Sequence, residues 1–249
     1  MALLKVLLLL GLGFPLNSDS VSLEKRIIGG HNCRDEERRF HVKITLNGRL
    51  QCGGSLISNQ WVLTAAHCWD PKGTLEAHLG VHLKRVKAES HKITRHEIYK
   101  DTNNDKHDIM LLKLPKETTT IKPIKLTDCS KPLEIGTKVQ IAGFGPAITG
   151  LDNKRIDHEP VDLQCAEIKI FYHGKKKRSS EEYQYEHWSC AKSSIKDTSS
   201  GDSGGGWVYQ DKLYGVHVLT GDRHKACSAP AYFMDICGYK KWIEDTIKT

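Results

Sequence analysis

Gly201-Asp202-Ser203-Gly204-Gly205 is the most informative segment of this 249-residue sequence. A serine flanked by glycines is typical of a tight turn whose backbone can approach a bound molecule closely. Upstream, Leu63-Thr-Ala-Ala-His67-Cys68 supplies a histidine and Asp108-Ile-Met-Leu-Leu112 supplies a carboxylate. Together the three segments predict one site that contains Ser203, His67 and Asp108.

Hydrolysis of an amide by a serine needs a base, a carboxylate that orients the base, and donors for the developing oxyanion. The sequence offers His67 as the base, Asp108 as the carboxylate and Ser203 as the nucleophile. The backbone amides of Gly201 and Ser203 are the candidate oxyanion donors. Each motif alone also fits an ordinary core histidine or a plain loop, but three motifs together argue against that alternative.

The rest of the chain has the pattern of an all-β protein, and 39% of its residues are apolar, enough for a full core. Near the C-terminus, residues 238–249 have helical spacing, which places Trp242, Ile243 and Ile247 on one face. Five other segments read as short strands because Gly, Pro, Asn or Asp bound them: 41–46, 61–64, 109–114, 138–142 and 207–209.

The order His, Asp, Ser and the sequence of each motif resemble the chymotrypsin and trypsin family of serine proteases, over residues 27–249. This resemblance implies an all-β fold of two six-stranded antiparallel β-barrels with a C-terminal helix. It also implies an active site between the barrels, protein or peptide substrates, and no cofactor. The alternative is a secreted binding protein of low or no activity on the same scaffold.

The first 16 residues predict a secretory signal peptide, and hence an extracellular protein. They form a leucine-rich stretch with one early lysine, Lys5, which is shorter than the roughly 20 apolar residues of a membrane span. A membrane anchor is the alternative. Residues 17–26 then read as an activation propeptide, because they end in a basic pair immediately before Ile27.

A trypsin-like protease would cut after Arg26, and residues 27–249 form the expected protease domain. The family resemblance implies that the new amino group of Ile27 turns inward and pairs with Asp202. Because half of a buried ion pair is costly to leave unpaired, the uncut precursor is expected to be nearly inactive.

The specificity pocket resembles the family only in part. Asp197 lies six residues before Ser203, where trypsin-like members carry the carboxylate that receives Arg or Lys, although a solvated loop aspartate is the alternative. The pocket walls depart from the family pattern and are expected to narrow the route to Asp197. The wall residues are Val218, Leu219, Thr220 and Ala231.

Eight cysteines indicate disulfides rather than a zinc site, because they are spread along the chain. The resemblance implies three of the pairs and leaves two cysteines without their usual partners, which are then expected to bond to each other. The implied pairs are Cys33–Cys165, Cys52–Cys68 and Cys129–Cys237, and the remaining pair is Cys190–Cys227.

The formal charge of +7 becomes +6 when residues 1–26, with three basic and two acidic side chains, are removed. The run Lys175-Lys176-Lys177-Arg178 is a candidate polyanion site, with a solvated loop as the alternative. Residues 81–89, where the family carries an acidic calcium loop, are mainly apolar and basic, so no metal is expected. A monomer without nucleic-acid or membrane partners is expected.

Overall fold

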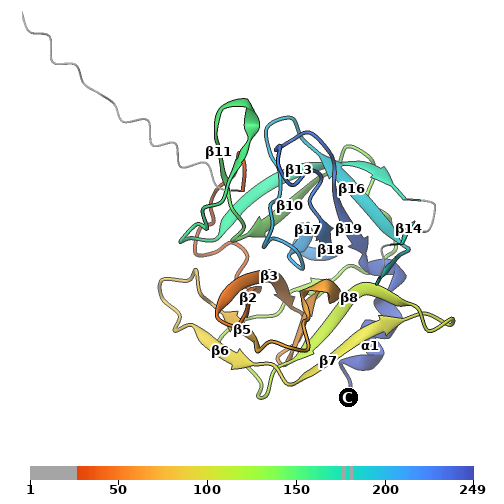
Figure 1. The fold of residues 1–249 in the computed structure, drawn as a ribbon. Coiled ribbons are helices and arrows are strands. Elements are labelled where there is room, and N and C mark those ends of the chain that lie inside the picture. Colours follow the sequence, from red (N-terminus) through yellow and green to blue (C-terminus); the bar gives the residue numbers. More distant parts are fainter. Residues whose placement is uncertain (1–26, 175–177, 180–181) are drawn as a thin grey trace, which may run out of the picture.

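The computed structural model describes residues 27–174, 178–179 and 182–249 (Figure 1). The signal peptide 1–16, the propeptide 17–26 with Arg26, and Lys175, Lys176 and Lys177 lie outside the described residues. Of Arg178 the structure describes only the backbone. In the described part of the chain, no helix has the length and apolarity that crossing a bilayer requires.

The C-terminal half of the chain forms a closed antiparallel barrel. Its strand order is β13-β10-β17-β18-β19-β16, and the pairing of β13 with β16 closes the ring. Trp207, Phe233 and Ile141 are buried in its core. The six strands are β10 (Lys138–Gly143), β13 (Gln164–His173), β16 (Trp188–Lys192), β17 (Gly206–Tyr209), β18 (Lys212–Leu219) and β19 (Ala231–Asp235).

The N-terminal half forms a second sheet, drawn below the barrel in Figure 1. Its order is β14-β15-β8-β4-β3-β2-β5-β6, with β7 beside β8, and its two ends do not pair among the described residues. The strands are β2 (His41–Leu46), β3 (Arg49–Leu56), β4 (Trp61–Thr64), β5 (Leu75–Leu79), β6 (Glu89–Lys92), β7 (Arg95–Lys100), β8 (Lys106–Lys113), β14 (Arg178–Ser179) and β15 (Gln184–Tyr185).

Two crossings tie the halves together. The helix α1 (Lys240–Thr246) follows the barrel in sequence, yet Ile243 is buried in the core of the N-terminal sheet. The second crossing is made by β15, which pairs in parallel with β8 through Gln184 and His107. A segment of the C-terminal half therefore lies beside the strand that contains Asp108.

The remaining elements are short. A hairpin of β11 (Ile148–Thr149) and β12 (Arg155–Ile156) projects from the barrel near its label in Figure 1. Two short strands make additional pairings with strands of the barrel: β1 (His31–Asn32) pairs with β13, and β9 (Lys125–Leu126) pairs with β18. Three 3₁₀ turns complete the fold: η1 (Ala66–Cys68), η2 (Leu151–Asn153) and η3 (Ile236–Gly238).

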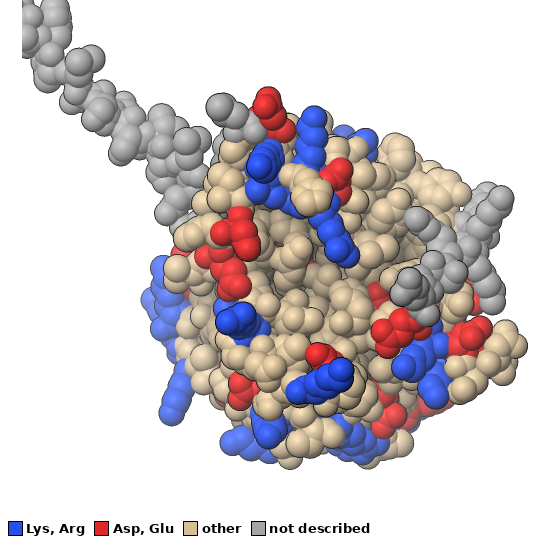
Figure 2. Space-filling model, viewed as in Figure 1, with Lys and Arg blue, Asp and Glu red and all other residues tan. Residues whose placement is uncertain are grey.

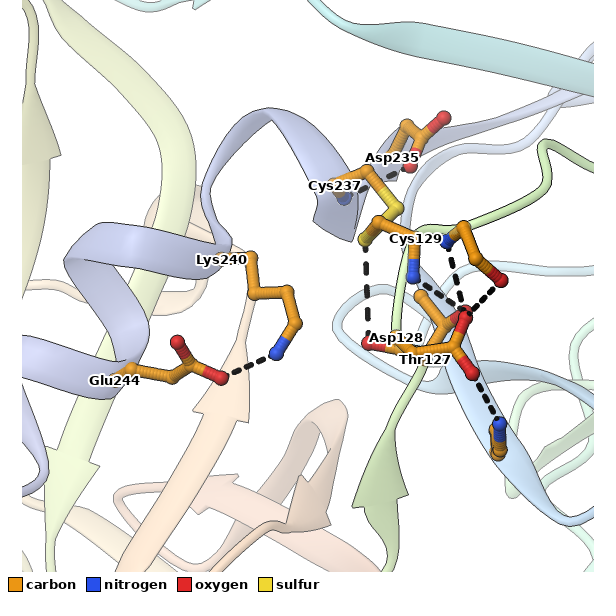
Figure 3. Close-up of a disulfide and its surroundings, with 9 residues drawn as sticks. Thr127, Asp128, Cys129, Asp235, Cys237, Lys240 and Glu244 are labelled. Carbon is orange, nitrogen blue, oxygen red and sulfur yellow. Dashed lines mark hydrogen bonds and ion pairs between the residues drawn. A yellow bond between two sulfur atoms is a disulfide. The ribbon is translucent and has the colours of Figure 1, made fainter.

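The all-β fold with a C-terminal helix is confirmed, and so are three disulfides. Cys33–Cys165, Cys52–Cys68 and Cys129–Cys237 are bonded. Figure 3 shows how Cys129–Cys237 fastens the segment before the barrel to the turn that leads into α1. Near this bond, Asp235 Oδ1 accepts a hydrogen bond of 2.9 Å from the Cys237 amide.

The predicted disulfide between Cys190 and Cys227 is wrong. Cys190 lies inside β16, where its backbone is paired with Tyr172 on one side and Tyr232 on the other. Cys227 lies in the loop between β18 and β19, and its amide donates to Asp197. The two cysteines were matched only because neither had its usual partner, and the fold holds them in different neighbourhoods.

Candidate active site

His67 and Asp108 are brought together by adjacent strands. His67 lies in η1, directly after β4, and Asp108 lies in β8, which pairs antiparallel with β4. Asp108 Oδ2 is 2.8 Å from His67 Nδ1, and Asp108 Oδ1 accepts a hydrogen bond of 2.9 Å from the His67 amide. With Nδ1 held by the carboxylate, Nε2 is the ring nitrogen left to accept a proton.

A tyrosine that the sequence did not single out also contacts the buried carboxylate. The Tyr185 hydroxyl donates to Asp108 Oδ2 across 3.3 Å. Tyr185 is 77 residues away in sequence and reaches Asp108 because β15 pairs with β8. Local sequence around Tyr185 carried no signal of this contact, since a parallel pairing between distant segments depends on the whole fold.

The environment of His67 favours its protonated form. Burial acts to lower the pKa of His67, but the negative charge of Asp108 and the hydrogen bond to it outweigh burial, so the pKa is raised above 6.5. Asp108 itself is fully buried. A fully buried carboxylate with donors on both oxygens is a suitable partner for an imidazolium.

Ser203 lies at the seam between the two sheets. Its carbonyl oxygen accepts a hydrogen bond of 2.7 Å from Gly53, in β3 of the N-terminal sheet. The next residue, Gly204, donates one of 2.7 Å to His217, in β18 of the barrel. Gly204 has φ +81° and faces Thr64, so a side chain at this position would be strained.

The turn before Ser203 leaves two amide groups available. Gly201 has φ +91°, a conformation that glycine adopts easily. The amides of Gly201 and Ser203 donate no hydrogen bond to any residue that the structure describes, whereas the Asp202 amide between them donates to Ser199. Two unpaired amides on one tight turn are what an oxyanion site requires.

A cleft of about 890 Å³ runs between the two halves. His67, Ser203 and Gly201 line it, and Val218, Leu219 and Thr220 lie along one wall. Three acidic side chains, those of Asp157, Glu159 and Glu182, also line the cleft. On the face shown in Figure 2, acidic and basic side chains are interspersed around a central region that has few charges.

Two of the predicted activation residues, Ile27 and Asp202, line one small cavity. Ile27 is 1% exposed and lines it together with Asp202 and Trp207. Asp202 accepts hydrogen bonds of 2.7 Å from the Ser199 amide and 2.8 Å from the Gly145 amide. Burial raises the pKa of Asp202 to about 6, because it outweighs the hydrogen bonds from the Ser199 and Gly145 amides, which lower this pKa.

Asp197 is buried, so the solvated-loop alternative is wrong. Its carboxylate already forms an ion pair with Arg155. Arg155 Nη2 lies 2.5 Å from Asp197 Oδ2, and the two side chains are 10% and 3% exposed. The cleft is lined by Thr220 but by neither Asp197 nor Ala231. The sequence singled out Asp197, which is buried, but gave no sign of its ion pair with Arg155.

Side chains that could share a metal ion form three groups among the described residues, and two of these include disulfide cysteines. The third consists of Asp101, His107 and Glu186. His107 Nδ1 lies 2.8 Å from the Tyr239 hydroxyl, and His107 Nε2 lies 3.7 Å from Asp101 Oδ2. Asp101, His107 and Glu186 all lie outside the predicted catalytic site.

The chain is similar in sequence and in fold to known serine proteases. Residues 27–243 match the family model described as Trypsin. Human kallikrein-8 is 33% identical, with 96% of this chain and 93% of that protein covered. Human serine protease 1 is also 33% identical, with 90% of each covered. The solved structure of neuropsin, a serine protease of mouse brain, has a TM-score of 0.71 at 29% identity and covers 88% of this chain and 98% of that one.

Proposed function

The chain belongs to the trypsin family and is a serine endopeptidase, and we propose that Ser203, His67 and Asp108 carry its catalysis. The observation that supports this most is the placement of His67. Asp108 holds one ring nitrogen at 2.8 Å, and the histidine lines the same cleft as Ser203. The unpaired amides of Gly201 and Ser203 complete the chemistry that peptide hydrolysis needs.

In the proposed reaction, Ser203 Oγ attacks the carbonyl carbon of the peptide bond and His67 Nε2 takes the hydroxyl proton. The carbonyl oxygen becomes an oxyanion and accepts hydrogen bonds from the Gly201 and Ser203 amides. His67 then gives its proton to the leaving amine, which leaves an acyl group on Ser203. Water releases the acyl group by the same proton transfers in reverse.

We propose that the protein is secreted as a precursor and activated by cleavage after Arg26, by a trypsin-like protease. The burial of Ile27 beside Asp202 supports this proposal, because an amino group released there would meet a carboxylate that lacks a full counter-charge. Pairing would stabilise the turn that carries the Gly201 and Ser203 amides, because Asp202 lies between these two residues.

Cleavage after Lys or Arg is the specificity that Asp197 suggests in the sequence. It requires a substrate side chain to reach that carboxylate. Arg155 already contacts it at 2.5 Å, so the specificity of the proposed enzyme depends on whether this ion pair opens.

The proposed activity is tested with protein processed to begin at Ile27. We expect it to hydrolyse members of a peptide library, and we expect Ser203→Ala to lower kcat/KM by on the order of 10⁶. Unchanged hydrolysis by Ser203→Ala would show that the activity comes from a contaminant. Absence of hydrolysis in both would favour the alternative, a secreted binding protein on a protease scaffold.

A further inference from the structure

We propose that Arg155 is a specificity-determining residue that occupies the base of the substrate pocket in place of a substrate side chain. The enzyme then cleaves after small uncharged residues and disfavours Lys and Arg. This inference rests on the proposed function of Ser203, His67 and Asp108. It concerns which peptide bond the enzyme cleaves, whereas the proposed function concerns the mechanism of cleavage.

The guanidinium of Arg155 has a protein partner for each of its nitrogens. Nη2 contacts Asp197 Oδ2 at 2.5 Å, and Nη1 donates to the Thr198 carbonyl at 2.7 Å and to Ser199 Oγ at 2.9 Å. Nε donates to the Asp222 carbonyl at 2.8 Å. Because every nitrogen of the guanidinium has a hydrogen-bond acceptor, the Arg155 side chain is held in one defined position.

Asp197 has little capacity left for a substrate. Besides Arg155, its Oδ2 accepts a hydrogen bond of 2.8 Å from the Cys227 amide, and its Oδ1 accepts one of 2.9 Å from the Thr198 amide. A substrate arginine would have to displace Arg155 and leave that guanidinium without its carboxylate. Separating a buried ion pair is strongly unfavourable. The cost of displacing Arg155 would therefore offset most of the binding free energy that a substrate arginine gains from Asp197.

The hairpin that carries Arg155 is fastened next to the pocket. The Arg155 amide donates to the His224 carbonyl at 3.0 Å, and the Ala226 amide donates to the Asn153 carbonyl at 3.0 Å. A β-bridge joins Lys154 to Lys225. Side-chain and backbone contacts therefore hold Arg155 in the same place.

A hydrogen bond between two threonines links the cleft lining to the residue that follows Asp197. Thr198 Oγ1 and Thr220 Oγ1 are 3.0 Å apart and form this hydrogen bond. Thr220 and Ser200 line the cleft, but Thr198 and Asp197 do not. We therefore expect a substrate side chain to meet Thr220 and Ser200 in the cleft and not to reach Asp197. Ala, Ser, Thr or Val fits such a site better than a long cation.

The inference is tested with processed protein and peptides that differ only in the residue before the cleaved bond. We expect the wild type to cleave after Ala or Val and to cleave poorly after Arg or Lys. Arg155→Ala should raise kcat/KM for the Arg and Lys peptides by about 10- to 100-fold, the range of one regained charged hydrogen bond. Lys154→Ala, in the same hairpin, should leave the preference unchanged.

Wild-type protein that prefers Arg or Lys peptides would overturn the inference, whatever Arg155→Ala does. An Arg155→Ala variant that reacts normally with a serine-directed phosphonate yet gains no Arg or Lys cleavage would also overturn it. Benzamidine, a small aryl cation, gives a readout independent of turnover: we expect its affinity to rise in Arg155→Ala, and unchanged affinity would count against the inference. Loss of phosphonate labelling in every form would instead defeat the proposed function.

Discussion

Asp108 accepts hydrogen bonds from the His67 amide, from His67 Nδ1 and from the Tyr185 hydroxyl. Val218 and Tyr185 both line the cleft that contains His67. The hydroxyl of Tyr185 thus supplies a polar contact next to an apolar wall. We infer that Tyr185 is a positioning residue, which acts on the reaction through Asp108.

Tyr185→Phe should lower kcat/KM by about 2- to 10-fold, the range expected for one hydrogen bond. Without the Tyr185 hydroxyl as a donor, Asp108 should interact more strongly with His67 and so raise the pKa of His67 further. We therefore expect the acid limb of the pH–rate profile to move to higher pH. Tyr172→Phe is the matched control, because the ring of Tyr172 packs on Trp188. A lower rate with an unmoved acid limb would contradict the positioning role.

The acid limb of the wild-type profile also follows from the pKa of His67. His67 must be neutral to accept a proton, so activity should rise as pH increases through its pKa, which is raised above 6.5. Asp108→Asn removes the charge that raises this pKa. We predict a limb at lower pH in this variant, together with a rate loss of about 10⁴-fold. A limb that stays in place would show that another group controls the profile.

At the scale of elements, the turn around Ser203 depends on glycine for two reasons that can be separated. Gly204 has φ +81° and faces Thr64 and the Gly53 carbonyl, whereas Gly48 has φ +79° and open space around it. We predict that Gly48→Ala lowers stability by about 1–2 kcal/mol, the cost of a left-handed alanine. Gly204→Ala should cost more and abolish activity. Equal losses on urea unfolding would contradict the close packing of this turn.

Much of the fold could be predicted from local pattern. The expected strands 41–46 and 61–64 coincide with β2 and β4, and the predicted helix at 238–249 contains α1, residues 240–246. Alternation of apolar residues and turn residues was sufficient there, because each signal is contained in a few neighbouring residues.

The departures from prediction involve contacts between distant residues. Arg155 reaches Asp197 across 42 positions and Tyr185 reaches Asp108 across 77. Neither contact has a local signal, because a two-stranded hairpin and a single parallel pairing place the side chains. The family resemblance identified Asp197 but could not show that another residue of the same chain already bound it.

At the scale of the whole molecule, the state of Asp202 would link the proposed activation to stability. Its pKa of about 6 lies above the ordinary 3.8, so the folded precursor binds protons more tightly than the unfolded chain. The precursor therefore loses stability as pH rises from about 4 to 6, by roughly 3 kcal/mol for a shift of this size. A freed Ile27 amino group should remove most of this loss by pairing with the carboxylate.

We predict that processed Ser203→Ala protein melts at a higher temperature than its Ser203→Ala precursor at pH 7. The difference in Tm should shrink towards pH 4, where Asp202 is protonated in the precursor. Both proteins lack the nucleophile, so self-digestion does not disturb the comparison. A difference in Tm that does not change with pH would contradict the role assigned to Asp202.

The central claim is that Ser203 is a nucleophile activated by His67 in the processed protein. Intact-mass measurement after treatment with a serine-directed phosphonate tests it most directly. We predict one adduct, located on Ser203, in the processed wild type, far slower labelling of the precursor and of His67→Ala, and none of Ser203→Ala. Processed wild-type protein that remains unlabelled, or that carries the adduct on another residue, would contradict the account.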